Sequence, residues 1–453
     1  MNARTFLWIA AALFLGGALA ACGKIEAITQ PAAQSGNANF RTYVAMGTSI
    51  TAGWESGGLV EHHQTKSYAY LFAHQAGASA FTIPSVSADG LPPLLRILSL
   101  NPLFITNAGR TPGAFTNLGQ PTSYHNMAVP YSTVFDAVDS IYYYTAIPPN
   151  PPNPERILMF ENIARHRGTI LQQVLGQGPT FISIEYGSNE VLGAASSGSG
   201  TPLLSPPLFD AIYDTLMANI ARFAPQANLA LVTVPDVTTI PFFTTFPPYT
   251  VSLTTGAPVS LVGPDGPLAP ADLVLLRAAD SLAIGTGIPV GGYNYVNPAA
   301  PGNGRPLLDS QVLNALESAE IQSAVAAENT TIRDAATTAG AALVDLNGLL
   351  REASTTGLHY QGHTYATDFV TGGLFSLDGV HPTDLAHGFI ANLMIDAVNA
   401  KYGAHIPHVN LSESATATSS RLQPARGSKP MPWIQGADRL CPIVMPGDVI
   451  AAR

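Results

Sequence analysis

Three short segments of this 453-residue chain carry side chains that could take part in nucleophilic catalysis. The first is Gly47–Gly53, where Ser49 directly follows the predicted strand Arg41–Met46. A serine in a tight turn between a strand and a helix can expose its hydroxyl, and backbone N–H groups at the helix start can stabilise an oxyanion. The same position equally suits a helix N-cap, so Ser49 alone does not define a site.

The other two segments supply an amide and a candidate base. Asn189 follows the apolar run Thr180–Glu185, where its side-chain N–H could donate to an oxyanion, although a plain turn residue fits there too. In the third segment, Leu377–Pro382, Asp378 precedes His381 by three residues in a Gly-containing turn. This spacing lets the carboxylate bind the imidazole Nδ1–H and leaves Nε2 as a general base. A capping Asp beside a surface His is the structural alternative.

An alternation of apolar runs and helical patterns must position these segments. Four apolar runs predict strands over Arg41–Met46, Thr180–Glu185, Asn228–Val234 and Ala341–Asp345. Helical patterns predict helices over Ser67–Ala76, Pro154–Leu175, Leu208–Phe223, Val312–Ala339 and Pro382–Ala400. We therefore predict an α/β fold: a three-layer α/β/α sandwich around a mostly parallel sheet. The carboxyl ends of parallel strands lie at one edge, where the three segments would converge.

In their order along the chain, these segments resemble the sequence blocks of the GDSL, or SGNH, family of serine esterases and lipases. The family's Gly-Asp-Ser block corresponds to Gly47–Ser49, with Thr48 in place of Asp. Its Gly-x-Asn-Asp block corresponds to Gly187–Glu190, and its Asp-x-x-His-Pro block matches Asp378–Pro382 without change. The resemblance covers most of the chain and implies the flavodoxin-like SGNH fold.

The resemblance also implies a reaction. Ser49 would attack an ester carbonyl, His381 would carry the proton, and Asp378 would orient the histidine, so that neither a metal nor an organic cofactor is needed. The expected substrate is a small-molecule or lipid ester, cleaved through an acyl-enzyme. Two alternatives remain: a carbohydrate acetylesterase, and a catalytically weak envelope lipoprotein that binds a lipid or a glycan.

The family's oxyanion hole implies three donors in this chain. They would be the Ser49 N–H, the Asn189 side chain and a backbone N–H from the second block, which resembles Asn126–Tyr131. Tyr131 stands where that block has glycine, and tyrosine resists the positive φ angles open to glycine. Gly109 is therefore an alternative source of this donor.

Composition narrows the class of partner. The chain has 20 Lys+Arg against 30 Asp+Glu, a net charge of -10, and no dense basic run, which argues against nucleic acid as a partner. Hydrophobic residues make up 46% and charged residues only 11%, a balance that argues against global disorder. The length indicates one large decorated domain or two smaller ones.

The first 22 residues resemble a bacterial lipoprotein signal. Met1–Arg4 carries a positive charge, Thr5–Ala18 is apolar but short for a bilayer span, and Leu19–Cys22 resembles a lipobox. We expect Cys22 to be lipidated, giving a membrane anchor at the cell envelope. Gly23, rather than Asp, follows the outer-membrane pattern of Gram-negative lipoproteins. A plain signal peptide is the alternative.

The remaining boundaries follow from changes in composition. We predict a flexible tether over residues 23–39, a hydrolase domain over 40–405 with an insertion at 235–305, and a C-terminal tail over 406–453 that contains Cys441.

The insertion is rich in proline and aromatic residues, which include Phe242, Phe243, Phe246 and Tyr249. These rings fit either a lid over an acyl pocket or a cluster packed onto the core.

Two histidine pairs have spacings that could suggest a metal. They are His62–His63, next to Glu61, and His359 with His363. Neither pair has the third ligand nearby in sequence that a catalytic zinc site needs, so we predict no metal site.

Overall fold

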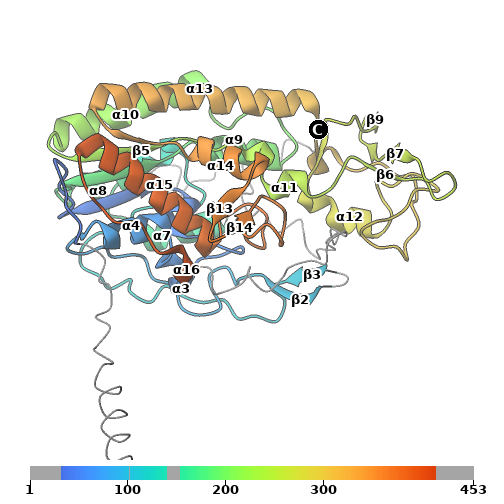
Figure 1. Cartoon of the computed structure of the whole chain (residues 1–453), viewed down its shortest axis with the longest axis horizontal. Helices are drawn as coiled ribbons and strands as arrows, with labels where there is room; N and C mark the ends of the chain where they lie inside the picture. Colours follow the sequence, from blue (N-terminus) through green and yellow to red (C-terminus); the bar gives the residue numbers. More distant parts are fainter. Residues whose placement is uncertain (1–31, 101–102, 140–153, 415–453) are drawn as a thin grey trace, which may run out of the picture.

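The computed structural model describes residues 32–100, 103–139 and 154–414, and its centre is a parallel sheet (Figure 1). The strands of this sheet lie in the order β1 (Tyr43–Gly47), β4 (Phe181–Glu185), β5 (Asn228–Val232) and β12 (Ala342–Val344). Each neighbouring pair is parallel, and Gly47 at the end of β1 lies opposite Glu185 at the end of β4. The carboxyl ends of β1 and β4 therefore present their following turns side by side.

Side chains along each strand alternate between two buried faces. In β1, Val44 and Met46 belong to one hydrophobic core, whereas Tyr43 and Ala45 belong to a second core on the other face. A sheet that is buried on both faces has no solvent-facing side to carry polar residues, which explains the continuous apolar runs in the sequence.

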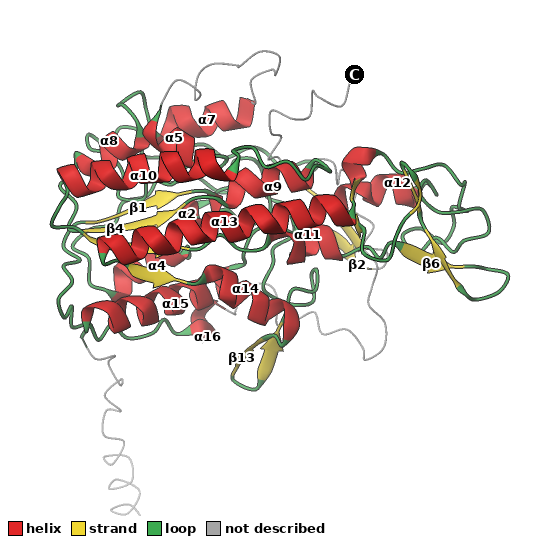
Figure 2. Cartoon of the chain, turned by 90° about the horizontal axis from the view of Figure 1, so that it is seen from above, coloured by secondary structure: helices red, strands yellow, loops and turns green. Residues whose placement is uncertain are grey.

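Helices cover both faces and complete three layers, with the strands lying between α10 and α15 in Figure 2. The core that contains Val44 packs against α5 (Val134–Val138), α7 (Pro154–Ile163), α8 (Ile170–Leu175), α9 (Ser188–Ser196), α10 (Pro206–Phe223) and α13 (Ala315–Ala339). The core that contains Tyr43 packs against α4 (Tyr68–Gln75), α15 (Asp384–Tyr402) and the first residue of α14 (Leu346–Thr355). The predicted three-layer fold is confirmed.

Short elements fill the connections. The short helices are α2 (Ser49–Ala52), α3 (Glu61–Gln64), α11 (Pro241–Thr244), α12 (Ala279–Ala283), α16 (Leu411–Ser414), η1 (Val237–Thr239), η2 (Leu276–Ala278) and η3 (Asp309–Gln311). The antiparallel ribbons pair β2 (Arg96–Leu100) with β3 (Leu103–Thr106), β6 (Tyr249–Val251) with β7 (Pro258–Ser260), β8 (Val262–Gly263) with β9 (Gly266–Pro267), β10 (Leu273–Val274) with β11 (Val312–Leu313), and β13 (Leu358–Tyr360) with β14 (His363–Tyr365).

The helix predicted over Pro154–Leu175 is wrong as a single element, because the structure has two helices there, α7 and α8. Arg165 and His166 both have a φ of 52°, and Gly168 has a φ of 99°, so the chain leaves helical geometry between them. Thr169 then starts α8 as an N-cap whose side chain accepts a backbone hydrogen bond.

Residues 235–305 leave the carboxyl end of β5 and extend beyond one end of the sheet, at the right of Figures 1 and 2. Phe242, Phe243 and Phe246 are at most 2% exposed and belong to the same core as Val44. The structure thus favours the cluster packed onto the core: these three rings lie inside the protein, which removes their apolar surface from water. Of the four aromatic side chains, Tyr249 is the exposed one, at 52%.

Both ends of the described chain pack at α15 or directly after it. Gln34 forms an antiparallel bridge with His405, and the Asn37 N–H donates to the Tyr402 carbonyl, so the predicted tether is held to the domain from Gln34 onward. In the predicted tail, Ile406 and Leu411 are buried. Cys22 and Cys441 lie outside the described residues. Across residues 32–100, 103–139 and 154–414, no helix has both the length and the hydrophobicity of a membrane span.

Two carboxyl groups are buried where α9 meets α13. Burial raises the pKa of Glu190 to about 8. A hydrogen bond from the Val134 N–H opposes this rise, whereas the nearby carboxyls of Asp136 and Glu185 add to it. Burial, and then the charge of Glu190, raises the pKa of Glu328. Both carboxyl oxygens of Glu328 and one of Glu190 are buried without a hydrogen-bond partner. Ionising this pair is therefore unfavourable in the folded state.

We predict that the protein loses stability as the pH rises. An unfolded Glu ionises near pH 4, whereas folded Glu190 holds its proton up to about pH 8, so this contribution to stability is full in acid and is lost as the pH rises through the folded pKa. Glu328→Gln removes one of the two charges and should raise the melting temperature more at pH 8.5 than at pH 5.5. Exposed Glu320 on the same helix gives the control, because Glu320→Gln should leave the difference between the melting temperatures at pH 5.5 and pH 8.5 as it is in the wild type. Equal shifts at both pH values in Glu328→Gln would contradict this account.

Candidate active site

Ser49, His381 and Asp378 lie in one line of hydrogen bonds. The His381 Nε2 atom is 2.9 Å from Ser49 Oγ, and its Nδ1 atom is 2.8 Å from Asp378 Oδ2. All three side chains are buried: Ser49 is 6% exposed, His381 4% and Asp378 0%. The structure thus brings together the three residues singled out from the sequence, although Ser49 and His381 lie 332 positions apart in the chain. This geometry allows a proton to pass from the serine hydroxyl to the imidazole.

The Asp378 carboxylate has a complete set of donors. One oxygen accepts from the Ser376 hydroxyl and from the N–H groups of Val380 and His381, and the other accepts from the Gly57 N–H besides facing the imidazole. Burial by itself would raise the pKa of Asp378, but His381 and the backbone donors outweigh burial and lower it. The carboxylate therefore stays ionised beside the histidine, which is what orienting the imidazole requires.

Glu185, which sequence reasoning missed, holds the turn that contains Ser49. Its carboxylate accepts from the Thr48 N–H at 2.9 Å, the Thr48 hydroxyl at 2.8 Å and the Thr51 hydroxyl at 3.0 Å. It also accepts from the Ser188 hydroxyl at 3.1 Å, in the turn before Asn189. Burial raises the pKa of Glu185, and these hydrogen bonds offset only part of the rise. The signal in the sequence was a charged residue that ends an otherwise apolar strand.

Gly47 allows this close approach. A Cβ atom at Gly47 would lie 2.5 Å from the Thr51 hydroxyl and 2.8 Å from the Glu185 carbonyl, so no larger residue fits between the two strand ends. Thr48, which replaces the family's Asp, serves here as a donor to Glu185.

Tyr131 adopts the backbone conformation of the glycine that it replaces. Its φ is 70°, a left-handed value that costs a non-glycine residue about 1–2 kcal/mol. Two side-chain contacts compensate: the Tyr131 hydroxyl donates to Glu155 at 2.9 Å, and the ring meets Trp54 edge to face at 5.5 Å. These tertiary contacts therefore stabilise a conformation that tyrosine was expected to resist.

Asn189 and the second block are joined directly. The Asn189 Nδ2 atom donates to the Ser132 carbonyl at 2.8 Å, next to Tyr131. The second block itself lies along β1, where the Val129 N–H donates to the Gly47 carbonyl. Gly109 instead lies in an exposed turn after β3, so the structure favours Tyr131 over Gly109 as the neighbour of Asn189.

Trp54 packs against His381 and was not singled out from the sequence. Its ring lies 5.8 Å from that of His381 and is 1% exposed. An apolar neighbour of this size excludes water from one side of the imidazole and limits the positions that the ring can take. Together with Tyr131 it forms an aromatic wall beside the triad.

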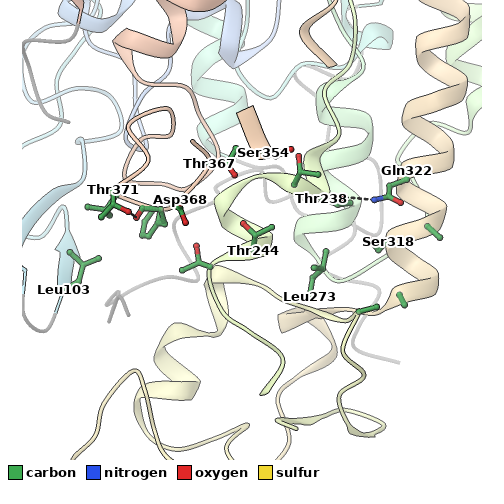
Figure 3. Close-up of a pocket in the computed structure, with 17 residues that line it drawn as sticks. Leu103, Thr238, Thr244, Leu273, Ser318, Gln322, Ser354, Thr367, Asp368 and Thr371 are labelled. Atoms are coloured by element: carbon green, nitrogen blue, oxygen red, sulfur yellow. Dashed lines mark hydrogen bonds between the residues drawn. The ribbon is translucent and has the colours of Figure 1, made fainter. Parts of the chain in front are cut away.

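A hydroxyl-rich pocket of about 680 Å³ lies between α11, α13 and residues 367–371 (Figure 3). Its threonines are Thr238, Thr239, Thr244, Thr245, Thr367 and Thr371. None of the triad residues lines it. The helix α11 connects the two places, because Thr244 lines the pocket while the Phe242 N–H donates to the Gly379 carbonyl, between Asp378 and His381, at 2.9 Å.

The two histidine pairs differ in their surroundings. His62 and His63 are joined by Asp384, from the first turn of α15, with one ligand atom of each residue within 4.8 Å of the others. The absence of a third ligand, which we inferred from sequence spacing, is therefore wrong for this pair. His359 and His363 are exposed on the β13–β14 ribbon, where the His359 Nδ1 atom faces the Thr364 hydroxyl.

Comparisons with known proteins assign the sequence to a family. The sequence profile described as GDSL-like Lipase/Acylhydrolase matches residues 43–394, and no curated protein matches the chain. One similar structure is a protein from Parabacteroides merdae described as a GDSL-like lipase, with 11% identity and a TM-score of 0.35 over 81% of this chain and 99% of that chain.

Two further similar structures come from Streptomyces. They are the extracellular lipase of Streptomyces rimosus, with 13% identity and a TM-score of 0.32 over 78% of this chain and 98% of that chain, and phospholipase A1 of Streptomyces albidoflavus, with 13% identity and a TM-score of 0.32 over 79% and 98%. The profile match spans well over half of the residues. The chain therefore belongs to the GDSL-like lipase/acylhydrolase family and is an ester-hydrolysing enzyme.

Proposed function

We propose that this protein hydrolyses carboxylic esters at the bacterial cell envelope, with Ser49, His381 and Asp378 as its catalytic triad. The observation that carries the proposal is the unbroken line of hydrogen bonds from the serine hydroxyl through the imidazole to the buried carboxylate. A serine hydroxyl is a weak nucleophile unless a base removes its proton, and the histidine is in position to do so.

The reaction follows from this geometry. Ser49 Oγ attacks the ester carbonyl carbon as its proton moves to His381 Nε2, and the carbonyl oxygen becomes an oxyanion. The tetrahedral intermediate then collapses, and the departing alcohol takes the proton from His381. Water attacks the acyl-enzyme with the same histidine as base, which releases the acid and restores the serine. Asp378 stabilises the imidazolium in both halves.

Three groups are proposed to stabilise the oxyanion: the backbone N–H groups of Ser49 and Tyr131, and the side-chain amide of Asn189. The left-handed φ of Tyr131 supports its inclusion, because the chain retains this conformation without the glycine that adopts it most easily. Asn189 Nδ2 carries two hydrogens, and the bond to Ser132 uses one of them.

A carbohydrate ester is the second candidate substrate. The threonine-lined pocket beside α11 supports it, since hydroxyl groups suit a hydroxylated leaving group better than an acyl chain. A panel of p-nitrophenyl esters from C2 to C16, assayed beside acetylated sugars, separates the two. Preference for acetylated sugars would establish an acetylesterase, and turnover of long-chain esters a lipase. No turnover of any ester by the folded protein would favour the catalytically weak, lipid- or glycan-binding alternative.

The envelope location rests on the N-terminal sequence. A lipidated Cys22, followed by Gly23, would hold the enzyme at the outer membrane of a Gram-negative bacterium. The membrane would then be its partner and a source of ester substrates.

We predict that Ser49→Ala and His381→Ala each lower kcat by about 10⁴–10⁶-fold, because either change removes the proton transfer that activates the nucleophile. Hydrolysis of p-nitrophenyl acetate by the purified variants measures this. Exposed Ser205, which makes no side-chain cap bond, gives a control serine whose replacement by alanine should leave kcat unchanged. Residual activity above a tenth of wild type in a folded Ser49→Ala variant would refute the assignment.

Asn189 and Tyr131 should respond differently to substitution. Asn189→Ala removes a side-chain donor and should lower kcat by about 10²–10³-fold with little change in KM. Tyr131→Gly keeps the backbone N–H and suits the positive φ, so it should retain kcat within about tenfold. Steady-state kinetics on one ester substrate compare the two. A larger loss in Tyr131→Gly than in Asn189→Ala would show that the tyrosine side chain, rather than its N–H, acts in the site.

We predict that Cys22→Ser releases the protein from the membrane fraction. Without a lipidated cysteine, the protein lacks the several acyl chains that hold a lipoprotein firmly in the membrane. Fractionation of cells followed by immunoblotting measures the distribution. Cys441→Ser is the matched control and should leave the protein with the membranes. A Cys22→Ser protein that still sediments with membranes after a high-salt wash argues against this anchor.

A further inference from the structure

Four metal-ligating side chains converge beside the catalytic turn. The His63 Nδ1 atom lies 2.9 Å from Asp384 Oδ1 and 3.2 Å from Glu55 Oε2. The His62 Nε2 atom lies 3.8 Å from the other oxygen of Asp384. These residues come from three places in the chain: the loop after α2, the helix α3 and the first turn of α15.

One atom of this cluster lacks a hydrogen-bond partner. Glu55 is 5% exposed, and its Oε2 atom is buried and accepts no hydrogen bond, although it points at His63 Nδ1. A single Nδ1–H can donate well to one acceptor, and Asp384 is the nearer. An ionised, buried carboxyl oxygen without a hydrogen bond is costly, so Glu55 needs either a bound cation or a proton, because burial and the nearby carboxyl of Asp384 raise its pKa.

We propose that Glu55, His62, His63 and Asp384 form a binding site for a divalent transition metal of the Zn²⁺ type. In a tetrahedral site with metal–ligand bonds of about 2.0–2.2 Å, ligand atoms lie about 3.3–3.6 Å apart. One atom each of His62, His63 and Asp384 lies within 4.8 Å of the others, and Glu55 Oε2 lies 3.2 Å from His63 Nδ1, so side-chain movement would have to bring these atoms to the separations of a tetrahedral site. A cation bound here would give the Glu55 Oε2 atom a partner and would favour the ionised form of its carboxyl group.

The donor set selects the class of metal. Two imidazole nitrogens and two carboxylate oxygens suit Zn²⁺ and its neighbours in the first transition row, whereas Ca²⁺ and Mg²⁺ prefer oxygen ligands throughout. The side chain of His62 is 64% exposed and that of His63 is 14% exposed, so a metal can reach the site from solvent on the histidine side.

The position of this site links it to the triad. Glu55 is followed by Ser56 and Gly57, and the Gly57 N–H donates to Asp378 Oδ2 at 3.0 Å. Asp384 begins the helix that follows His381. A metal held by Glu55 and Asp384 would therefore fasten the loop that supports the triad carboxylate to the helix that follows the triad histidine. Its role would be to position these segments, and the esterase reaction needs no contact with it.

The competing explanation is that Glu55 keeps a proton, which it shares with the carboxyl of Asp384, and that the cluster binds no metal. Zinc binding to the purified, untagged full chain decides between the two. After treatment with EDTA, addition of ZnCl₂ should give one bound Zn²⁺ per chain by calorimetry and should raise the melting temperature. Addition of CoCl₂ should give the intense visible absorption of four-coordinate Co²⁺.

Single substitutions test the ligands. Glu55→Gln, His63→Asn and Asp384→Asn preserve shape, and each should weaken zinc binding at least about tenfold. His62→Ala should do the same, and because His62 is exposed this variant should keep the melting temperature of the metal-free protein. The double variant His359→Ala/His363→Ala is the matched control and should bind zinc as the wild type does.

Two outcomes would overturn the site. One is wild-type protein that takes up no stoichiometric zinc and shows no cobalt absorption. The other is a loss of zinc binding in His359→Ala/His363→Ala as large as that in His62→Ala, which would indicate adventitious binding by surface histidines.

Discussion

The buried carboxylate of Glu185 is the interaction on which the catalytic edge depends. It ends β4 directly opposite Gly47, the last residue of β1, and accepts hydrogen bonds from Thr48, Thr51 and Ser188. These donors belong to the turns that carry Ser49 and Asn189. Because this one carboxylate binds both turns, it fixes the position of Ser49, the proposed nucleophile, relative to the amide proposed to stabilise the oxyanion.

The opposite side of the site is held by a second set of contacts. Asp378 receives donors from its own turn and from Gly57, and the Gly379 carbonyl accepts from the Phe242 N–H in the insertion. The three buried phenylalanines of the insertion pack in the core and hold α11 in place, and α11 supports the backbone between Asp378 and His381. The insertion therefore supports the backbone of the turn that carries Asp378 and His381.

Buried carboxyl groups recur throughout this chain, although only 11% of its residues are charged. The environment decides the state of each one. Asp378 has enough donors, together with a histidine, to stay ionised. Glu190 accepts from the Val134 N–H and holds its proton to about pH 8. Glu55 has one oxygen without a hydrogen bond, which lies beside His63. The same chemical group therefore serves as an orienting anion, as a neutral packing element and as a proposed metal ligand.

The sequence by itself determined the class of fold and the expected place of the site. Apolar runs, helical periodicity and the spacing of Asp378 and His381 predicted a parallel sheet with its site at the carboxyl edge. These features are local, so a periodic pattern or a three-residue spacing is enough to reveal them. Only the tertiary structure decided what depends on contacts between distant segments. Glu185 meets Thr48 across 137 positions, Asp384 meets His63 across 321, and the left-handed backbone of Tyr131 is stabilised by Glu155 and Trp54. No local pattern encodes such meetings, because which side chains share a buried space is set by how the layers pack.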